Sequence, residues 1–152
     1  MSARIIDGKQ VAAAIRQELQ QKIAALRSET GIQPGLAVVL VGTDPASQSY
    51  VSAKEKACAE IGIYSSDNRL PAETSEEELL ALIDKLNRDP KIHGILVQLP
   101  LPRQISESKI INAIAPEKDV DGFHPVSVGK MVLGEETYLP CTPHGVLQLL
   151  QR

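Results

Sequence analysis

Aromatic residues are scarce in this chain, which has no tryptophan, one phenylalanine and three tyrosines among its 152 residues. The hydrophobic core must therefore be aliphatic, and the chain is long enough to bury one of useful size. Cysteine is scarce too, since Cys58 and Cys141 are the only two and lie far apart in the sequence. Such a pair predicts neither a disulfide framework nor a metal site, which fits a reducing, cytoplasmic location.

Several kinds of segment are missing as well. No apolar run approaches the ~20 residues that a membrane span requires, and the first ten residues, MSARIIDGKQ, lack the apolar segment of a signal peptide. The formal net charge of −3 provides no basic surface for nucleic acid. No G-x-G-x-x-G occurs, and no residues have the spacing of a metal site. We therefore predict a soluble protein without nucleic-acid, membrane or metal partners.

Strands and helices alternate in the hydrophobic pattern. Apart from Gln98, the runs 36–41 (LAVVLV) and 95–99 (ILVQL) are apolar throughout, which is typical of strands buried on both faces, and 63–70 is a weaker strand. Helical spacing and capping residues predict helices over residues 7–30, 44–62, 75–89, 106–115, 125–133 and 143–151. This order predicts an α/β fold, a three-layer α/β/α arrangement with a mainly parallel sheet.

The predicted helix 44–62 carries a lysine in the middle of its apolar face. At about 100° per residue, one arc is shared by Tyr50, Val51, Lys54, Ala57, Cys58 and Ile61. A lysine among apolar neighbours either extends its ammonium group past them into solvent or is desolvated for proton transfer. Tyr50 lies one turn before Lys54 and is either a core residue or a surface on which a planar ligand stacks.

A polar side chain also interrupts the second apolar strand. Ligands of parallel α/β sheets bind beyond the carboxyl ends of the strands, and Gln98 lies near such an end. Its amide either caps a neighbouring loop or faces Lys54 across the crevice. In the second case its oxygen accepts from the amine without locking the amine in its charged form.

The predicted loop 119–125 holds two carboxylates and a glycine. Asp119 and Asp121 are either turn formers, the commonest use of aspartate in such a loop, or groups that bind a ligand. His93 and His124 are interpreted as surface or loop residues rather than as ligands. The residues alone leave both interpretations of the carboxylates open.

Four long segments of the chain match the signatures of a known family. They are, in order, VGTDPASQSYVSAKEKACAEIGI with its Y-x-x-x-K pattern, GILVQLPLP, PEKDVDGFHPVSVGKM and LPCTPHGVLQLL. With these segments the chain resembles bifunctional methylenetetrahydrofolate dehydrogenase/methenyltetrahydrofolate cyclohydrolase. The resemblance implies a multifunctional enzyme of one-carbon metabolism, which supports purine and amino-acid biosynthesis. Such an enzyme oxidises 5,10-methylene-tetrahydrofolate with NADP and then hydrolyses 5,10-methenyl-tetrahydrofolate to 10-formyl-tetrahydrofolate.

The resemblance also implies roles for four residues. Lys54 matches the family's catalytic lysine, and Gln98 matches the residue that orients it and tunes its basicity. Tyr50 matches the aromatic residue that stacks on the folate, and Asp121 matches the carboxylate that holds the pterin. The chemistry agrees, because a pterin offers an N–H and an amino group side by side to a carboxylate. Hydrolysis of a cationic methenyl carbon also needs a group that moves protons near neutral pH, which a desolvated lysine supplies.

The chain departs from this family in one respect. Family members continue through an interdomain helix into a second, Rossmann-type cofactor domain, which is absent from this chain. We expect residues 1–140 to form the folate-binding catalytic domain and residues 141–152 to be the truncated start of that helix. NADP is then the cofactor of the full-length protein, which we expect to be a homodimer, and this chain binds none.

Three functional hypotheses remain at this stage. In the first, the chain is the catalytic domain of the bifunctional enzyme, with tetrahydrofolate derivatives as its partners. In the second, the isolated chain binds folate with little or no turnover, because the cleft needs a second wall. In the third, the chain is a small α/β interaction module in which Lys54 is only structural.

Overall fold

The sheet of this protein consists of three parallel strands. The computed structural model describes residues 5–152, so the first four residues of the stretch tested for a signal peptide lie outside it. The strands are β1 (Gly35–Val41), β2 (Tyr64–Leu70) and β3 (Gly94–Val97). Their order is β2-β1-β3, and Val39 in the central strand pairs with Asn68 on one side and Val97 on the other. The predicted parallel sheet is confirmed.

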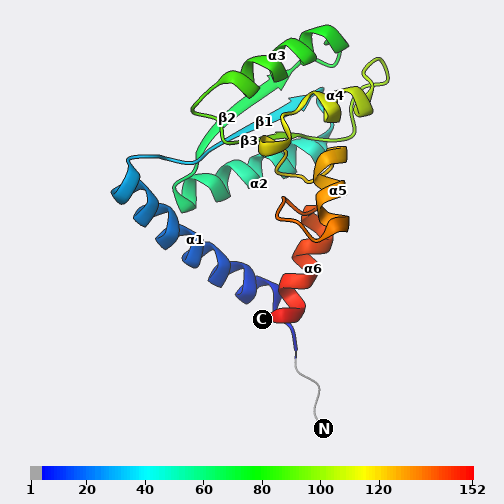
Figure 1. Ribbon diagram of the computed structural model, residues 1–152. Coiled ribbons are helices and arrows are strands. Elements are labelled where there is room, and N and C mark those ends of the chain that lie inside the picture. Colours follow the sequence, from blue (N-terminus) through cyan, green and yellow to red (C-terminus); the bar gives the residue numbers. More distant parts are fainter. Residues whose placement is uncertain (1–4) are drawn as a thin grey trace.

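Helices cover both faces of the sheet (Figure 1). One face is covered by α2 (Pro45–Ile61), the other by α3 (Glu76–Arg88) and α4 (Glu107–Ala113). Successive side chains of β1 point to opposite faces, so Val38 joins a buried cluster with Val51 of α2. Its neighbour Val39 joins a second cluster with Leu79 and Ile83 of α3. The predicted three-layer α/β/α architecture and its aliphatic core are confirmed.

Local capping chemistry sets where the helices begin. The Asp44 carboxylate accepts a hydrogen bond from the Ser47 N–H at 2.8 Å, and a proline occupies the first position of α2. Ser75 and Glu78 form a reciprocal capping box at the start of α3. The Asp44 cap fixes where α2 begins, and it therefore also fixes how far along the helix Lys54 lies.

Three element boundaries lie two residues from their predicted positions, and one of them is the end of α4 at Ala113 rather than at residue 115. β3 ends at Val97, so Gln98 lies just beyond the strand. Its N–H still donates to Val39 O at 2.8 Å, but a proline follows two residues later and has no N–H to continue the ladder. The last helix, α6 (Cys141–Gln151), begins before Pro143, where its start was predicted. A proline is tolerated there because the N–H groups of a first helical turn have no partner within the helix.

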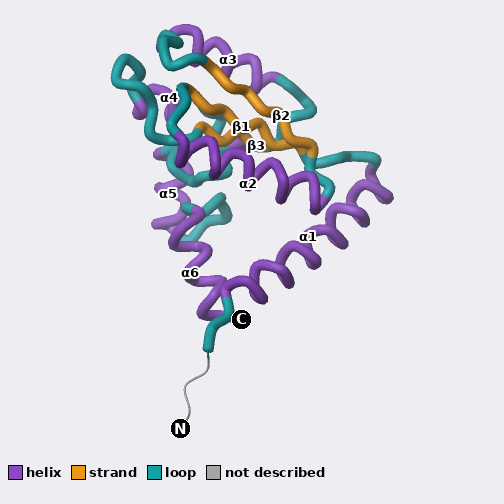
Figure 2. Tube along the Cα trace, turned by 180° about the vertical axis from the view of Figure 1, so that it is seen from behind, coloured by secondary structure: helices purple, strands orange, loops and turns teal. Residues whose placement is uncertain are grey.

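The longest helix, α1 (Gly8–Thr30), extends away from the sheet, and its first turns meet the end of α6 (Figures 1 and 2). There the guanidinium group of Arg152 binds both carboxylate oxygens of Glu18, at 2.6 and 2.9 Å. Further along, Gln20 Nε2 donates to Glu60 O of α2 at 3.3 Å. No residue of α1 is buried.

The chain between α4 and α6 forms a short 3-10 helix, η1 (Pro116–Lys118), and the helix α5 (Pro125–Leu133). Within residues 5–152 there is no second sheet. None of the helices in this range has both the length and the apolar character needed to cross a membrane. The same range contains no group of three His, Cys, Asp or Glu side chains arranged to hold a metal ion.

Candidate active site

A cleft of about 470 Å³ opens at the carboxyl end of β3, beside α2. Its lining is drawn from several segments of the chain: Tyr50, Lys54, Val97, Gln98, Leu99, Asp121, Phe123, Pro140, Cys141, Thr142 and Pro143. The chain leaves β1 through α2 on one face and reaches β3 through α3 on the other. Ligands of open α/β sheets bind at such a switch point between neighbouring strands. All four residues predicted as a site line this one cleft.

Lys54 and Gln98 are in contact across the cleft. The half-buried Lys54 donates from Nζ to Gln98 Oε1 at 3.1 Å. Gln98 Nε2 donates to Leu99 O at 2.8 Å. A carbonyl oxygen can only accept, so this second bond turns the amide oxygen towards the lysine. Of the two interpretations left open for Gln98, the structure shows the contact with Lys54, and the Gln98 amide also binds the loop that follows it.

Asp121 shares the cleft with the lysine and with a thiol. Burial raises the pKa of the Asp121 carboxyl, and the nearby Lys54 ammonium offsets part of that rise. Cys141 Sγ lies 3.6 Å from Asp121 Oδ1 and 3.8 Å from Val120 O, close enough to donate its single S–H to either. Burial, followed by the charge of Asp121, raises the pKa of the Cys141 thiol. The thiol therefore stays protonated and acts as a weak donor to the carboxylate.

Two aromatic side chains line the cleft with much of their surface exposed. Tyr50 is 65% exposed, so it is not a core residue, and its ring is available to a planar ligand. Phe123 is 45% exposed and is the only phenylalanine of the chain. Sequence reasoning overlooked Phe123 and Cys141 as lining residues. The position of the sole phenylalanine in a polar loop was a signal that pointed to the first of them.

The loop that carries Asp121 can turn only because Gly122 follows. Gly122 has a φ of +67°, and a Cβ there would lie 2.7 Å from Tyr138 O. The backbone of residues 138–140 therefore lies directly against the loop. This approach brings Cys141, the next residue in the chain, to the Asp121 carboxylate.

Three further polar residues considered in the sequence analysis have different structural roles: Asp119, His124 and His93. Asp119 is buried and accepts hydrogen bonds from the start of α5, so it does more than form a turn. Of the two alternatives for His124, surface or loop, the structure shows the second: it ends the loop as the buried N-cap of α5, and its Nδ1 accepts from Val126 N at 3.1 Å. His93 is exposed, as predicted, and its Nδ1 accepts from Gly35 N.

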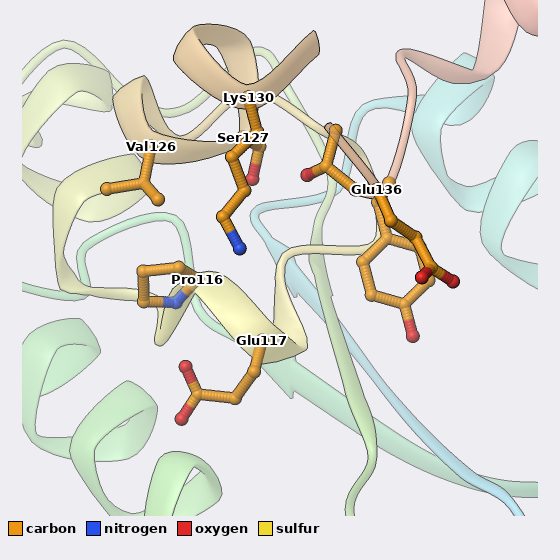
Figure 3. A pocket seen from close by; sticks show the side chains of 8 residues that line it. Pro116, Glu117, Val126, Ser127, Lys130 and Glu136 are labelled. Carbon is orange, nitrogen blue, oxygen red and sulfur yellow. The ribbon is translucent and has the colours of Figure 1, made fainter. Parts of the chain in front are cut away.

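A second hollow, of about 410 Å³, lies between η1, α5 and the segment that leads to α6 (Figure 3). Among the residues around it are Glu117, Ser127, Lys130 and Glu136. None of the four predicted site residues lines this hollow. The cleft beside α2 brings a lysine, an amide and a carboxylate together, which makes it the candidate active site.

The fold and the cleft together define a class of protein: an α/β domain that brings a lysine and a carboxylate into one cleft at a switch point of its sheet. Comparison with known families agrees. A family model described as the tetrahydrofolate dehydrogenase/cyclohydrolase catalytic domain matches residues 6–121. The chain belongs to the tetrahydrofolate dehydrogenase/cyclohydrolase family.

Relatives match almost the whole chain. The bifunctional protein FolD of Halalkalibacterium halodurans is 64% identical over 151 residues, which cover 99% of this chain and 54% of the relative. The FolD crystal structure from Campylobacter jejuni has a TM-score of 0.95 and 51% identity, covering 99% of this chain and 53% of that one. FolD of Trypanosoma brucei, solved with NADP and an inhibitor, has a TM-score of 0.94 and 38% identity. The match covers 99% of this chain and 52% of that one. The chain thus spans about half the length of the curated relatives it matches.

Proposed function

We propose that this chain is the folate-binding catalytic part of an enzyme that interconverts 5,10-methylene-, 5,10-methenyl- and 10-formyl-tetrahydrofolate. One observation carries the proposal: Lys54 and Gln98, 44 residues apart, are hydrogen-bonded in a cleft that also contains Asp121. Residues 1–140 would be the folate-binding domain and residues 141–152 the start of an interdomain helix. We further propose that the full-length enzyme is cytoplasmic and forms a homodimer.

Folate recognition would use the carboxylate and the aromatic side chain. Asp121 has two acceptor oxygens, and a pterin presents an N–H and an amino group at matching spacing. The half-exposed Phe123 and the more exposed Tyr50 supply flat apolar surface on which a fused ring or its aryl extension can stack. Burial of Asp121 strengthens the hydrogen bonds it makes, because competing water is excluded.

Hydrolysis would use Lys54 as the group that moves protons. Water attacks the cationic methenyl carbon and passes a proton to the Lys54 amine, which has to be uncharged at that step to accept it. The resulting carbinolamine then breaks its C–N5 bond, N5 takes up a proton, and the formyl group stays on N10 with the net release of one proton. Gln98 suits this role because its oxygen holds the amine in place in either protonation state, whereas a carboxylate would favour the charged form.

The residues of this chain do not fit a dinucleotide. In dinucleotide-binding folds the pyrophosphate binds at the N-terminus of the helix after the first strand, beside a glycine-rich turn. Here the equivalent place, the start of α2, is taken by the Asp44 carboxylate, which accepts the Ser47 N–H. A phosphate would meet this negative charge. NADP use would therefore depend on residues outside this chain, and no hydride-transfer step is assigned to those within it.

Titration of the 152-residue chain with tetrahydrofolate in a calorimeter tests the proposal. Asp121→Asn turns one acceptor into a donor that faces the pterin, and a mismatched buried hydrogen bond costs about 1–3 kcal/mol. Affinity should fall roughly ten- to a hundredfold. Asp84→Asn, on the exposed side of α3, is the matched control and should bind as the wild type does. No binding by the wild-type chain, or equal binding by the Asp121 variant, would contradict the proposal.

A rate measurement then separates catalysis from binding alone. The hydrolysis of methenyl-tetrahydrofolate by the same chain is followed by its absorbance. Binding without hydrolysis would support the hypothesis that the isolated chain is a folate-binding domain with little turnover. Hydrolysis that depends on Lys54 would show that this cleft suffices for the chemistry.

A further inference from the structure

A carboxylate that the proposed mechanism does not use lies behind the cleft. Asp119 is only 2% exposed, and it does not line the cleft. Its Oδ2 accepts from His124 N at 2.9 Å and from Ser127 Oγ at 2.7 Å. Burying a carboxylate is costly unless it is well hydrogen-bonded. The chain retains one here, two residues before the carboxylate that faces the cleft.

The hydrogen bonds of Asp119 close a short loop. The side chain of residue 119 holds the backbone N–H of residue 124, so residues 120–123 form the connection between them. Two of those four residues, Asp121 and Phe123, line the cleft. A hydrogen bond from Gly122 N to Asp119 O at 3.3 Å lies inside the same loop. The position of the two lining side chains therefore depends on a closure made by Asp119.

The same residue also ties the loop to the sheet. The backbone of Asp119 makes a parallel bridge with Ile95 of β3, three residues before Gln98. Its side chain binds the first turn of α5, where backbone N–H groups without helical partners favour a negative charge. Ser127, which donates to this carboxylate, is itself one of the residues that line the second hollow (Figure 3). One residue thus joins sheet, loop and helix.

From these contacts we infer that Asp119 is a positioning residue: its carboxylate fixes the loop so that Asp121 and Phe123 face the folate. The inference rests on the proposed function, because it takes Asp121 to be the folate ligand. The two aspartates then have different roles. Asp119 faces inward and holds the backbone, and Asp121 faces the cleft and binds.

Ser127→Ala is the sharpest test, since it removes the 2.7 Å bond to Asp119 without touching any residue that lines the cleft. Asp119→Asn is the second variant and weakens both bonds. Ser75→Ala, which removes the N-cap of α3 far from the loop, is the matched control for a general loss of stability. Two quantities are measured on the 152-residue chain: tetrahydrofolate affinity by calorimetry, and hydrogen exchange of the amides of residues 120–124 without ligand.

We expect both loop variants to exchange these amides faster and to bind tetrahydrofolate about three- to tenfold more weakly per folded molecule. The Ser75 variant should lose stability but keep wild-type affinity and loop exchange. Unchanged affinity in Ser127→Ala, with or without faster exchange, would overturn the inference. If Asp119→Asn does not fold, Ser127→Ala decides alone. A wild-type chain that does not bind tetrahydrofolate would instead overturn the proposed function, so the two failures can be told apart.

Discussion

The helices that lie on the sheet and the helix α1 have similar sequence patterns but are held in different ways. α2 and α3 bury apolar side chains against the strands: Val51, Cys58, Ile61, Leu79, Ile83 and Leu86. α1 also carries an apolar stripe, yet none of its residues is buried. Its specific contacts are polar and lie at the surface, such as the Glu18–Arg152 pair and the bond from Gln20 to Glu60.

The candidate site lies among the elements that are packed on the sheet. Every residue that lines the candidate site belongs to α2, to the end of β3, to the loop before α5 or to the start of α6, and none belongs to α1. Burial on the sheet holds Lys54 to within hydrogen-bonding distance of Gln98. Surface pairs contribute little stability and are weakened by salt. Substitutions in the two regions should therefore differ in kind as well as in size.

The largest effect should come from a substitution that leaves the packing on the sheet intact. Lys54→Arg keeps charge and length, but a guanidinium group does not release a proton at working pH. Methenyl-tetrahydrofolate hydrolysis should fall by about a hundredfold or more, with little change in the urea midpoint. Lys56→Arg, exposed on the same helix, is the control and should retain the wild-type rate. More than a tenth of the wild-type rate in Lys54→Arg would remove the proposed role.

A pair of leucine truncations compares the two regions directly. Leu79 of α3 is fully buried in the cluster under the sheet, and Leu19 of α1 is 39% exposed. Leu79→Ala should cost about 2–5 kcal/mol of unfolding free energy, because it loses apolar burial and leaves a cavity. Leu19→Ala should cost about 1 kcal/mol or less. Urea unfolding measures both, and equal losses would mean that α1 is as much a part of the core as α3.

The buried charge of Asp121 should lower the free energy of unfolding at neutral pH. Burial raises the pKa of this carboxyl in the folded state. Such a group favours folding when protonated, so its contribution is full below the unfolded-state pKa of about 3.9 and is lost as pH rises through the higher folded-state pKa. Asp121→Asn should therefore melt above the wild type at pH 7, and the difference should shrink towards pH 4. A lower melting temperature at pH 7 would mean that the carboxylate is satisfied within the cleft.

The smallest effect is expected where α1 meets α6. Glu18→Gln removes the charge that the Arg152 guanidinium group binds, a bond that also lowers the pKa of Glu18. Global melting should barely change, whereas amide exchange in the first turns of α1 should become faster. In wild type the contribution of this pair should be lost as pH falls through the lowered pKa of Glu18, and should weaken with added salt. Tetrahydrofolate affinity should be the same as in the wild type.

Much of the fold could be predicted because its signals are local. The capping residues behind the predicted helices 44–62 and 75–89 and the two apolar runs each act within a few residues. The structure has N-caps at Asp44 and Ser75, and strands that cover most of both runs. The boundaries that were missed depend on more than local pattern. A proline inside the first turn hid the true start of α6, and a single polar residue was counted in β3 although the ladder had ended.

The candidate site was predictable where a residue contradicted its own neighbourhood. Lys54 in an apolar arc and Gln98 in an apolar strand stood out in this way, and their contact follows once β1 and β3 are neighbours. For Cys141, Phe123 and Asp119 the orientation of the side chain could not be predicted, because loops and helix starts have no hydrophobic period from which to read it. Their catalytic or binding roles remain predictions for the experiments above.

By itself, the sequence determined the three-layer α/β architecture, the positions of most caps and the choice of Lys54 and Gln98, since these depend on periodicity and on residues within a turn of each other. The residues alone left open which of two similar aspartates faces the cleft; the family resemblance pointed to Asp121, and the tertiary structure gives the physical reason. The backbone of residues 138–140 packs against Gly122, and the start of α5 donates hydrogen bonds to the Asp119 carboxylate. Asp121 then lies in the cleft near Lys54 and Cys141. Those contacts join segments that lie far apart in the chain, and only their packing against the sheet brings them together.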